Sequence, residues 1–293
     1  MRLGVVVLPE LAWSEARSVW RDVEAMGFAH AWTYDHLAWR DLRDGPWFGA
    51  VPFLAGAATV TSTLCLGPLV SSPNFRHPVA FAREVVSLDD ISEGRINLGI
   101  GAGGQGWDAS VLGEEPWSPG ERVERYAEFV EVLDRLLVEG SLSFRGRYYS
   151  ASEARALPGC RQRPRVPFVL AGSGPMAMAT VARHGQVWVT TGPRGTGELV
   201  SPVEGAGAVV EQGRILDEAC HRMGRNGAEI DRMVLLGPVL DQGLSSPQAF
   251  ADTLGAYESA GVTDVVVHWP RPAEPYAGRR SDFEKAVLPV LGL

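Results

Sequence analysis

EGRINLGIGAGGQGW, residues 93–107, joins an apolar run to a loop made almost entirely of glycine. Its apolar run follows a turn signal at Gly94, and such a run is typical of a strand buried on both faces of a parallel sheet. The glycines that come next would let the backbone approach a large, flat group closely. The stretch therefore predicts a buried strand that ends in a loop at a binding site.

The same loop also matches the spacing of a dinucleotide-binding fingerprint, with glycine at positions 99, 101 and 104. That fingerprint requires a helix to begin at the third glycine, because the helix N-terminus holds the pyrophosphate. Here Pro116 and Pro119 delay the next helical pattern until about Gly120. We therefore interpret the loop as a strand end of another parallel-sheet fold and not as a Rossmann motif.

On both sides of this strand, apolar runs alternate with amphipathic helical patterns along the chain. The other expected strands are 3–8, 30–34, 64–70, 167–171, 186–190, 232–239 and 264–268. Helical patterns cover 15–26, 51–62, 79–91, 121–137, the residues after Pro175, 204–223, 247–260 and 281–291. Residues 142–149 are expected to form a small hairpin turned at Gly146, and 150–165 an irregular connection.

This alternation continues without a linker or a break in composition. We therefore expect residues 1–293 to form one α/β domain, a single (β/α)₈ TIM barrel with loop insertions at the C-terminal face of the barrel. A doubly wound sheet is the alternative, and eight strand–helix units in fewer than 300 residues favour closure.

Composition excludes several classes of protein. A net charge of −8 argues against a nucleic-acid partner, since such proteins concentrate Lys and Arg. No apolar run reaches the length of a membrane span, and residues 1–9 are too short for a signal peptide. The three cysteines are scattered, which favours neither disulfides nor a metal site. We expect a cytoplasmic protein without a bound metal.

In a barrel of this kind, active sites lie at the C-terminal ends of the strands. The residues expected there include Asp35-His36, which are either an acid–base pair or a turn-capping aspartate beside a surface histidine. Gly172-Ser173-Gly174 begin a helix, where they are either an anion site or an ordinary turn. Three tryptophans lie in loops on this face and are suited to line the site of a flat ligand: Trp39, Trp47 and Trp107. We expect Arg76 to be structural and to pair with a carboxylate.

Several motifs resemble the bacterial luciferase-like superfamily, and within it the oxidoreductases that depend on the deazaflavin F420. They are YDHL at 34–37, LGPLVSSPNFRHP at 66–78, GRINLGIGAG at 94–103, Glu121-Arg122, and AGSG at 171–174 followed by RHG at 183–185. The resemblance spans essentially the whole chain. These motifs identify the superfamily more sharply than they separate F420 from FMN.

The resemblance implies a cofactor ring across the mouth of the barrel, backed by a cis non-proline peptide bond that would fall at Leu69–Val70. It assigns cofactor contacts to Asp35 at the polar edge of the ring, to Leu69, Val70, Ser71, Ala102, Gly103 and Thr191 around it, and to Gly172, Ser173 and Gly174 at the cofactor phosphate. It also makes His36 the acid–base residue, with Trp39 stabilising charge nearby, although Trp39 lies one residue closer to the histidine than in the family.

Other features depart from the family's sugar-phosphate dehydrogenases. Those enzymes carry a glutamate where this chain has Gly104, so a sugar-phosphate substrate is disfavoured. Arg194 sits near a basic position that binds substrate phosphate in the family, but it is a single arginine.

The resemblance implies an F420-dependent oxidoreductase that transfers hydride to or from a small organic substrate. Deazaflavins activate oxygen poorly, so the reaction would be a reduction or a dehydrogenation. One alternative is an FMN-dependent monooxygenase that receives reduced flavin from a separate reductase. Another is a non-catalytic barrel, which the glycine loop and the phosphate motif argue against. A homodimer formed through the helices that flank the second and third strands is also expected.

Overall fold

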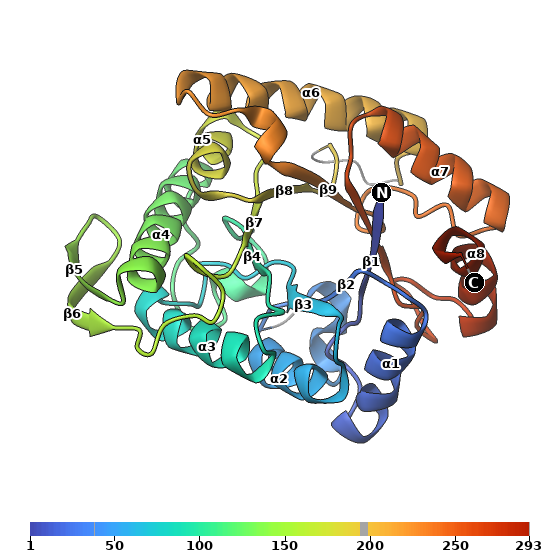
Figure 1. Cartoon of the computed structure of the whole chain (residues 1–293), viewed down its shortest axis with the longest axis horizontal. Helices are drawn as coiled ribbons and strands as arrows, with labels where there is room; N and C mark the ends of the chain where they lie inside the picture. Colours follow the sequence, from blue (N-terminus) through green and yellow to red (C-terminus); the bar gives the residue numbers. More distant parts are fainter. Residues whose placement is uncertain (38, 194–198, 293) are drawn as a thin grey trace.

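A computed structural model describes residues 1–37, 39–193 and 199–292. Eight parallel strands form the centre of the molecule, and helices surround them (Figure 1). The strands are β1 (Arg2–Val6), β2 (His30–Thr33), β3 (Cys65–Pro68), β4 (Leu98–Ile100), β7 (Phe168–Ala171), β8 (Val187–Thr190), β9 (Asp231–Leu235) and β10 (Asp264–His268). The helices are α1 (Trp13–Ala25), α2 (Ala50–Val60), α3 (Pro78–Ile91), α4 (Pro119–Glu139), α5 (Pro175–His184), α6 (Pro202–Arg222), α7 (Pro247–Ser259) and α8 (Arg280–Leu291).

The strands pair in the order β3-β2-β1-β10-β9-β8-β7-β4. The two ends of this sheet meet, because the backbone N–H of Leu66 donates to the carbonyl of Arg95 at 2.9 Å and that of Ser71 donates to the carbonyl of Gly99 at 2.9 Å. A β-carbon at Gly99 would lie 2.2 Å from the carbonyl oxygen of Pro68, so only glycine permits this approach. The expected (β/α)₈ barrel is confirmed.

A polar cluster joins three strands at the N-terminal end of the barrel. Asp264 on β10 accepts two hydrogen bonds from the Arg2 guanidinium, at 2.7 and 2.6 Å, and lies 3.0 Å from Nε2 of His30 on β2. The Trp32 indole N–H donates to Nδ1 of His30 at 2.7 Å, so that nitrogen carries no proton and Nε2 donates to Asp264. Each member of the cluster is thereby satisfied.

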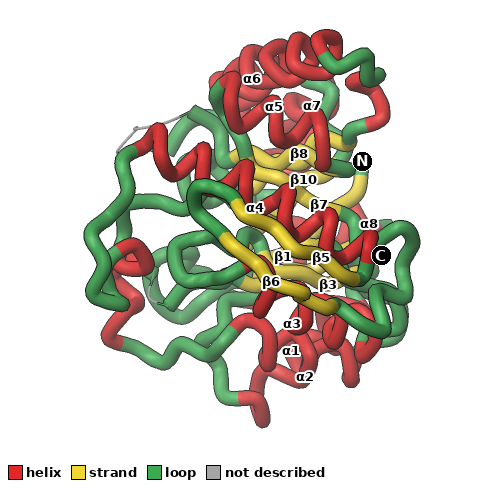
Figure 2. The backbone as a smooth tube through the Cα atoms, turned by 90° about the vertical axis from the view of Figure 1, so that its left-hand side faces the viewer, coloured by secondary structure: helices red, strands yellow, loops and turns green. Residues whose placement is uncertain are grey.

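The hairpin differs from the sequence prediction. Its strands are β5 (Ser141–Arg145) and β6 (Ser150–Arg155), which lie on the outside of the barrel beside α4 (Figure 2). The turn is wider than expected because the Glu128 carboxylate on α4 accepts the backbone N–H groups of residues 147–149. The second strand therefore starts only at Ser150, in a segment that we expected to be irregular.

Three short 3₁₀ helices lie in loops: η1 (Arg40–Asp44), η2 (Trp107–Ala109) and η3 (Gly227–Glu229). The first two follow β2 and β4 on the C-terminal side of the barrel, where they border the site described below. In the part of the chain that the structure describes, no helix combines the length and the apolar character needed to span a bilayer.

Candidate active site

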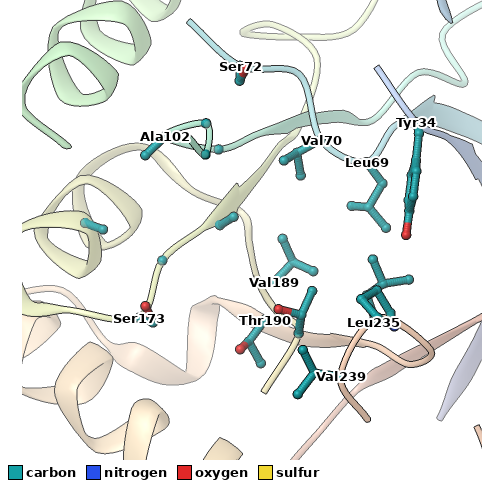
Figure 3. A pocket seen from close by; sticks show the side chains of 18 of the residues that line it. Tyr34, Leu69, Val70, Ser72, Ala102, Ser173, Val189, Thr190, Leu235 and Val239 are labelled. Carbon is teal, nitrogen blue, oxygen red and sulfur yellow. The ribbon is translucent and has the colours of Figure 1, made fainter. Parts of the chain in front are cut away.

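A cavity of about 590 Å³ opens at the C-terminal ends of the strands. Most of the strand-end loops contribute to it, so residues far apart in the sequence share its wall. Figure 3 shows Ser173 at one end of the cavity and Tyr34 at the other, with Val70 and Val189 between them. The cavity is thus an elongated slot of a size that suits a ring system together with a small second molecule.

One long wall of the slot is the segment after β3. The peptide bond between Leu69 and Val70 is cis, as the resemblance implied, and both side chains line the cavity. Ser72 follows on the same wall and is 4% exposed, and its hydroxyl has no hydrogen-bond partner in the described structure. Buried hydroxyls are normally paired, so Ser72 marks a place where a bound molecule would supply a polar contact.

The glycine loop after β4 forms the adjoining edge. Residues 101–104 line the cavity, and Gly103 has a φ of +75°, a backbone conformation that glycine adopts readily. A β-carbon at Gly103 would also lie 2.5 Å from Oδ1 of Asn74. The loop therefore lies tightly against the segment after β3 and presents backbone, rather than charged side chains, to the slot.

The N-terminus of α5 reaches the far end of the slot. Gly172 and Ser173 line the cavity, and α5 begins at Pro175 with Gly174 in an extended conformation before it. Among the described residues, no side-chain hydrogen bond caps this helix end. Unsatisfied N–H groups and the positive end of the helix dipole make such a terminus suitable for a phosphate.

His36 has a partner that the sequence did not reveal. Its Nδ1 lies 2.5 Å from Oδ2 of Asp108, a residue of η2 that is 5% exposed. The second carboxylate oxygen of Asp108 accepts the backbone N–H of Leu37 at 2.7 Å, which fixes the carboxylate in place. Because the carboxylate is an acceptor, Nδ1 of His36 is the donor, and Nε2 is the nitrogen that can exchange a proton with a ligand.

Tyr34 closes the opposite end of the slot. Its hydroxyl lies 2.8 Å from Nε2 of His268 and 3.4 Å from the hydroxyl of Tyr276, which stacks on the histidine ring. Burial lowers the pKa of His268 to about 3, so this imidazole is neutral at physiological pH. Burial raises the pKa of Tyr34 well above its ordinary value, so its hydroxyl remains protonated.

The structure brings most of the expected site residues to one cavity. His36, Trp39, Leu69, Val70, Ala102, Gly103, Gly172, Ser173 and Thr191 all line it. Ser71 and Gly174 are next to lining residues and do not line it themselves. Arg194 lies outside the described residues.

Asp35 has a different setting from the one expected. It is buried behind the cavity wall, where Arg76 binds both of its carboxylate oxygens and the Ser71 hydroxyl donates to it at 2.5 Å. Asp35 is therefore not the acid–base partner of His36. The expected pairing of Arg76 with a carboxylate is confirmed, and Glu84 accepts a further bond from it at 2.6 Å.

Sequence reasoning missed Asp108, Ser72 and Tyr34 as site residues. Asp108 stands 72 positions from His36, and no local pattern links the two. Ser72 could have been found as the hydroxyl that follows the strand end, and Tyr34 as the residue before Asp35. Among the described residues, no group of three or more His, Cys, Asp or Glu side chains is arranged to hold a metal ion.

Fold and site together define a parallel barrel whose cavity of about 590 Å³ is bordered by a cis Leu69–Val70 peptide bond and by the N-terminus of α5. A model of the luciferase-like monooxygenase family matches residues 1–243. The chain belongs to the luciferase-like monooxygenase family.

Two curated relatives illustrate the range of the family. An F420-dependent glucose-6-phosphate dehydrogenase of Beutenbergia cavernae is 33% identical over 175 residues, which are 59% of this chain and 51% of that protein. A 5,10-methylenetetrahydromethanopterin reductase of Methanopyrus kandleri is 27% identical over 227 residues, 73% of this chain and 62% of that protein. The matched part of this chain thus spans between half and two thirds of these relatives.

Solved structures share the fold over nearly the whole chain. The coenzyme F420-dependent tetrahydromethanopterin reductase from Methanopyrus kandleri superimposes with a TM-score of 0.73 at 19% identity, covering 98% of this chain and 97% of that one. An F420-dependent secondary alcohol dehydrogenase, solved with an F420–acetone adduct, gives 0.79 at 16% identity, covering 99% and 98%. At these identities the likeness establishes the fold alone.

Proposed function

We propose that this protein is an F420-dependent oxidoreductase that interconverts an alcohol and a carbonyl compound, or reduces a comparable small organic substrate. The observation that carries the proposal is the His36–Asp108 pair at the wall of a ring-sized slot. A hydride transfer to or from a carbon–oxygen bond must be accompanied by a proton transfer at the oxygen. The curated relatives that depend on F420 support the choice of cofactor.

The residues present fit such a cofactor. Leu69, Val70 and Ala102 offer apolar contacts to a flat ring, and the unpartnered hydroxyl of Ser72 offers a polar one. Gly172 and Ser173, before the N-terminus of α5, would hold its phosphate. When bound, F420 supplies two-electron hydride chemistry.

His36 then acts as the acid–base residue. Its Nε2 accepts the hydroxyl proton of an alcohol, or returns that proton to the oxygen of a carbonyl compound in the reverse direction. Asp108 holds the imidazole in the tautomer that leaves Nε2 unprotonated, and it stabilises the imidazolium once the proton has been taken up. Trp39, whose ring centroid is 6.5 Å from that of His36, adds an aromatic face beside this charge.

We further infer that residues 1–293 act as one cytoplasmic domain that forms a homodimer through the helices flanking β2 and β3. Helix α2 supports this arrangement, because its sequence AVPFLAGAATV contains no charged residue although Pro52 and Thr59 are exposed. A helix that is apolar all round is normally covered. Light scattering of the protein as it elutes from a size-exclusion column should give twice the chain mass of 31.6 kDa. A monomeric mass would contradict this inference.

Titration of the purified protein with F420 and, separately, with FMN tests the cofactor assignment. The slot contains Trp39, so intrinsic tryptophan fluorescence should report binding. We expect saturable quenching by F420 at micromolar concentrations and a weaker response to FMN. Tight binding of FMN without a response to F420 would replace the proposal with a flavin-dependent monooxygenase served by a separate reductase. The absence of both responses would favour a non-catalytic barrel.

A further inference from the structure

The slot has one end that the proposed cofactor contacts do not use. At this end the wall changes from glycine and small polar residues to larger side chains. These include Tyr34, Leu235 and Val239, and the rings of His36 and Trp39 pack against Tyr34 at centroid distances of 5.8 and 5.0 Å. Figure 3 shows Tyr34, Leu235 and Val239 away from Ser173, across the slot. A substrate would lie here, beside the acid–base histidine, and most of the surface that it meets is apolar.

Three of the described carboxylates near this end have partners. Asp108 is bound to His36, and Asp35 is bound to Arg76. Glu10 accepts two hydrogen bonds from Arg271, at 2.6 and 2.7 Å. The charges of Asp35 and Glu10 are thus balanced by arginines, and the Asp108 carboxylate is engaged by hydrogen bonds.

Arg40 is the exception among the charged side chains that line the described part of the slot. No carboxylate among the described residues pairs with its guanidinium, which instead lies 4.8 Å from the centroid of the Trp39 ring. The backbone at Arg40 has a φ of +47°, a region that non-glycine residues rarely occupy. An arginine held in an uncommon backbone conformation at the wall of a site is a candidate for function.

The positive charge of Arg40 also acts on the polar groups at this end. Burial raises the pKa values of Tyr34 and Tyr276, and the charge of Arg40 works against both rises. Both phenols remain protonated and can donate hydrogen bonds. The substrate end of the slot thus contains a cation and the protonated hydroxyl of Tyr34, with no unpaired carboxylate among its described lining residues.

We propose that the substrate carries a carboxylate at the end remote from its reacting carbon, and that Arg40 binds this carboxylate. The inference rests on the proposed function and names the substrate class: a small hydroxy or oxo acid with an apolar body. The apolar body contacts Leu235, Pro238 and Val239, and the reacting oxygen faces His36. An acidic protein with a net charge of −8 otherwise repels such anions, so a local cation is required.

A carboxylate fits this site better than a phosphate ester does. The planar guanidinium of one arginine matches the two oxygens of a carboxylate. A phosphate ester has a larger charge and more acceptor oxygens, and it usually binds several donors. The described residues of this end offer one arginine.

Binding of two probes of matched length, hexanoate and 1-hexanol, tests the proposal without turnover. Tryptophan fluorescence of the protein without cofactor follows both titrations. We expect the wild type to bind hexanoate about tenfold more tightly than 1-hexanol, the gain typical of one charge-assisted contact. Arg40→Gln should remove this preference, and Arg40→Lys should keep part of it.

Arg43→Gln is the matched control. The Arg43 guanidinium also lies over a tryptophan ring, that of Trp107, but Arg43 does not line the slot. This variant should keep the full preference for hexanoate. Equal binding of the two probes by the wild type, no binding of hexanoate, or an unchanged preference in Arg40→Gln would overturn the proposal. The F420 titration of Arg40→Gln is a separate readout and should match that of the wild type. A wrong cofactor assignment would appear in this titration, whereas a wrong substrate assignment would appear only in the binding of the two probes.

Discussion

Asp108 determines which nitrogen of His36 faces the slot. Both oxygens of its carboxylate are engaged, one by Nδ1 of the imidazole and the other by the backbone N–H of Leu37. A histidine held in this way has a defined tautomer before any substrate arrives. His36 was identifiable from the sequence because it follows a strand, whereas Asp108 became its partner only through closure of the barrel.

Asp108→Asn should lower turnover by about 10²- to 10⁴-fold, the range over which a positioned acid–base residue acts. The amide can donate to Nδ1, which would move the imidazole proton to Nε2 and leave no base facing the substrate. Nitrogen-15 NMR of the histidine side chains checks the tautomer directly, without a substrate. Asp44→Asn, at a side chain that is 88% exposed, should change neither quantity. An Asp108→Asn protein that keeps the wild-type tautomer and rate would refute this role.

Gly99→Ala tests the close approach of β3 and β4. The added methyl group would lie 2.2 Å from the Pro68 carbonyl oxygen and 3.2 Å from a methyl group of Val70. The clash with Pro68 is with backbone, so relieving it requires the strands to move. We expect the free energy of unfolding to fall by at least about 1–3 kcal/mol, the usual cost of overpacking a core. Denaturant unfolding measures the change. Gly106→Ala is the control, since nothing lies within 4 Å of its added β-carbon, and equal effects of the two variants would contradict this explanation.

At the scale of elements, the strands could be predicted because buried parallel strands are continuous apolar runs between turn signals. β10 and β8 lie almost where the sequence placed them. The second hairpin strand, β6, could not be located because its start depends on a distant carboxylate, that of Glu128. Contacts across elements, rather than local propensity, decided that boundary.

The strands β1, β2 and β10 are held together by Asp264, which gives stability a pH dependence. Burial by itself would raise the pKa of Asp264, but hydrogen bonds from His30 and Arg2 outweigh it and hold this pKa well below its ordinary range. A carboxylate with a lowered pKa in the folded protein stabilises it above the unfolded-state pKa, about 4, and this contribution is lost as the pH falls below that value.

Asp264→Asn should therefore reduce the free energy of unfolding at pH 7 by about 2–3 kcal/mol, the scale of hydrogen bonds to a charged group. Its stability should also decline less than that of the wild type between about pH 5 and pH 3. Denaturant unfolding at each pH measures both effects. Asp90→Asn removes a surface pair with Arg161 and should change stability by less than about 0.5 kcal/mol. If the free energy of unfolding varied with pH in the same way in the wild type and in Asp264→Asn, Asp264 would not be the cause of the pH dependence.

At the scale of the whole molecule, the barrel brings to one slot the residues that the chain scatters among its strand ends. The sequence could identify the face that carries the site, because the strand ends of a barrel share one side. It could not reveal that Asp35 turns away to Arg76, or that the apolar end of the slot has an arginine, Arg40, that pairs with no carboxylate among the described residues. Those features depend on how loops from different strands meet.

A crystal structure of the protein soaked with F420 would show directly whether the slot is the cofactor site. We expect density for the deazaflavin ring against Leu69–Val70, with a polar contact from Ser72 and the phosphate at Gly172 and Ser173. We also expect Nε2 of His36 to face the space left beside the ring. An empty slot at saturating F420, or a ring bound elsewhere on the protein, would refute the assignment of the slot as the cofactor site.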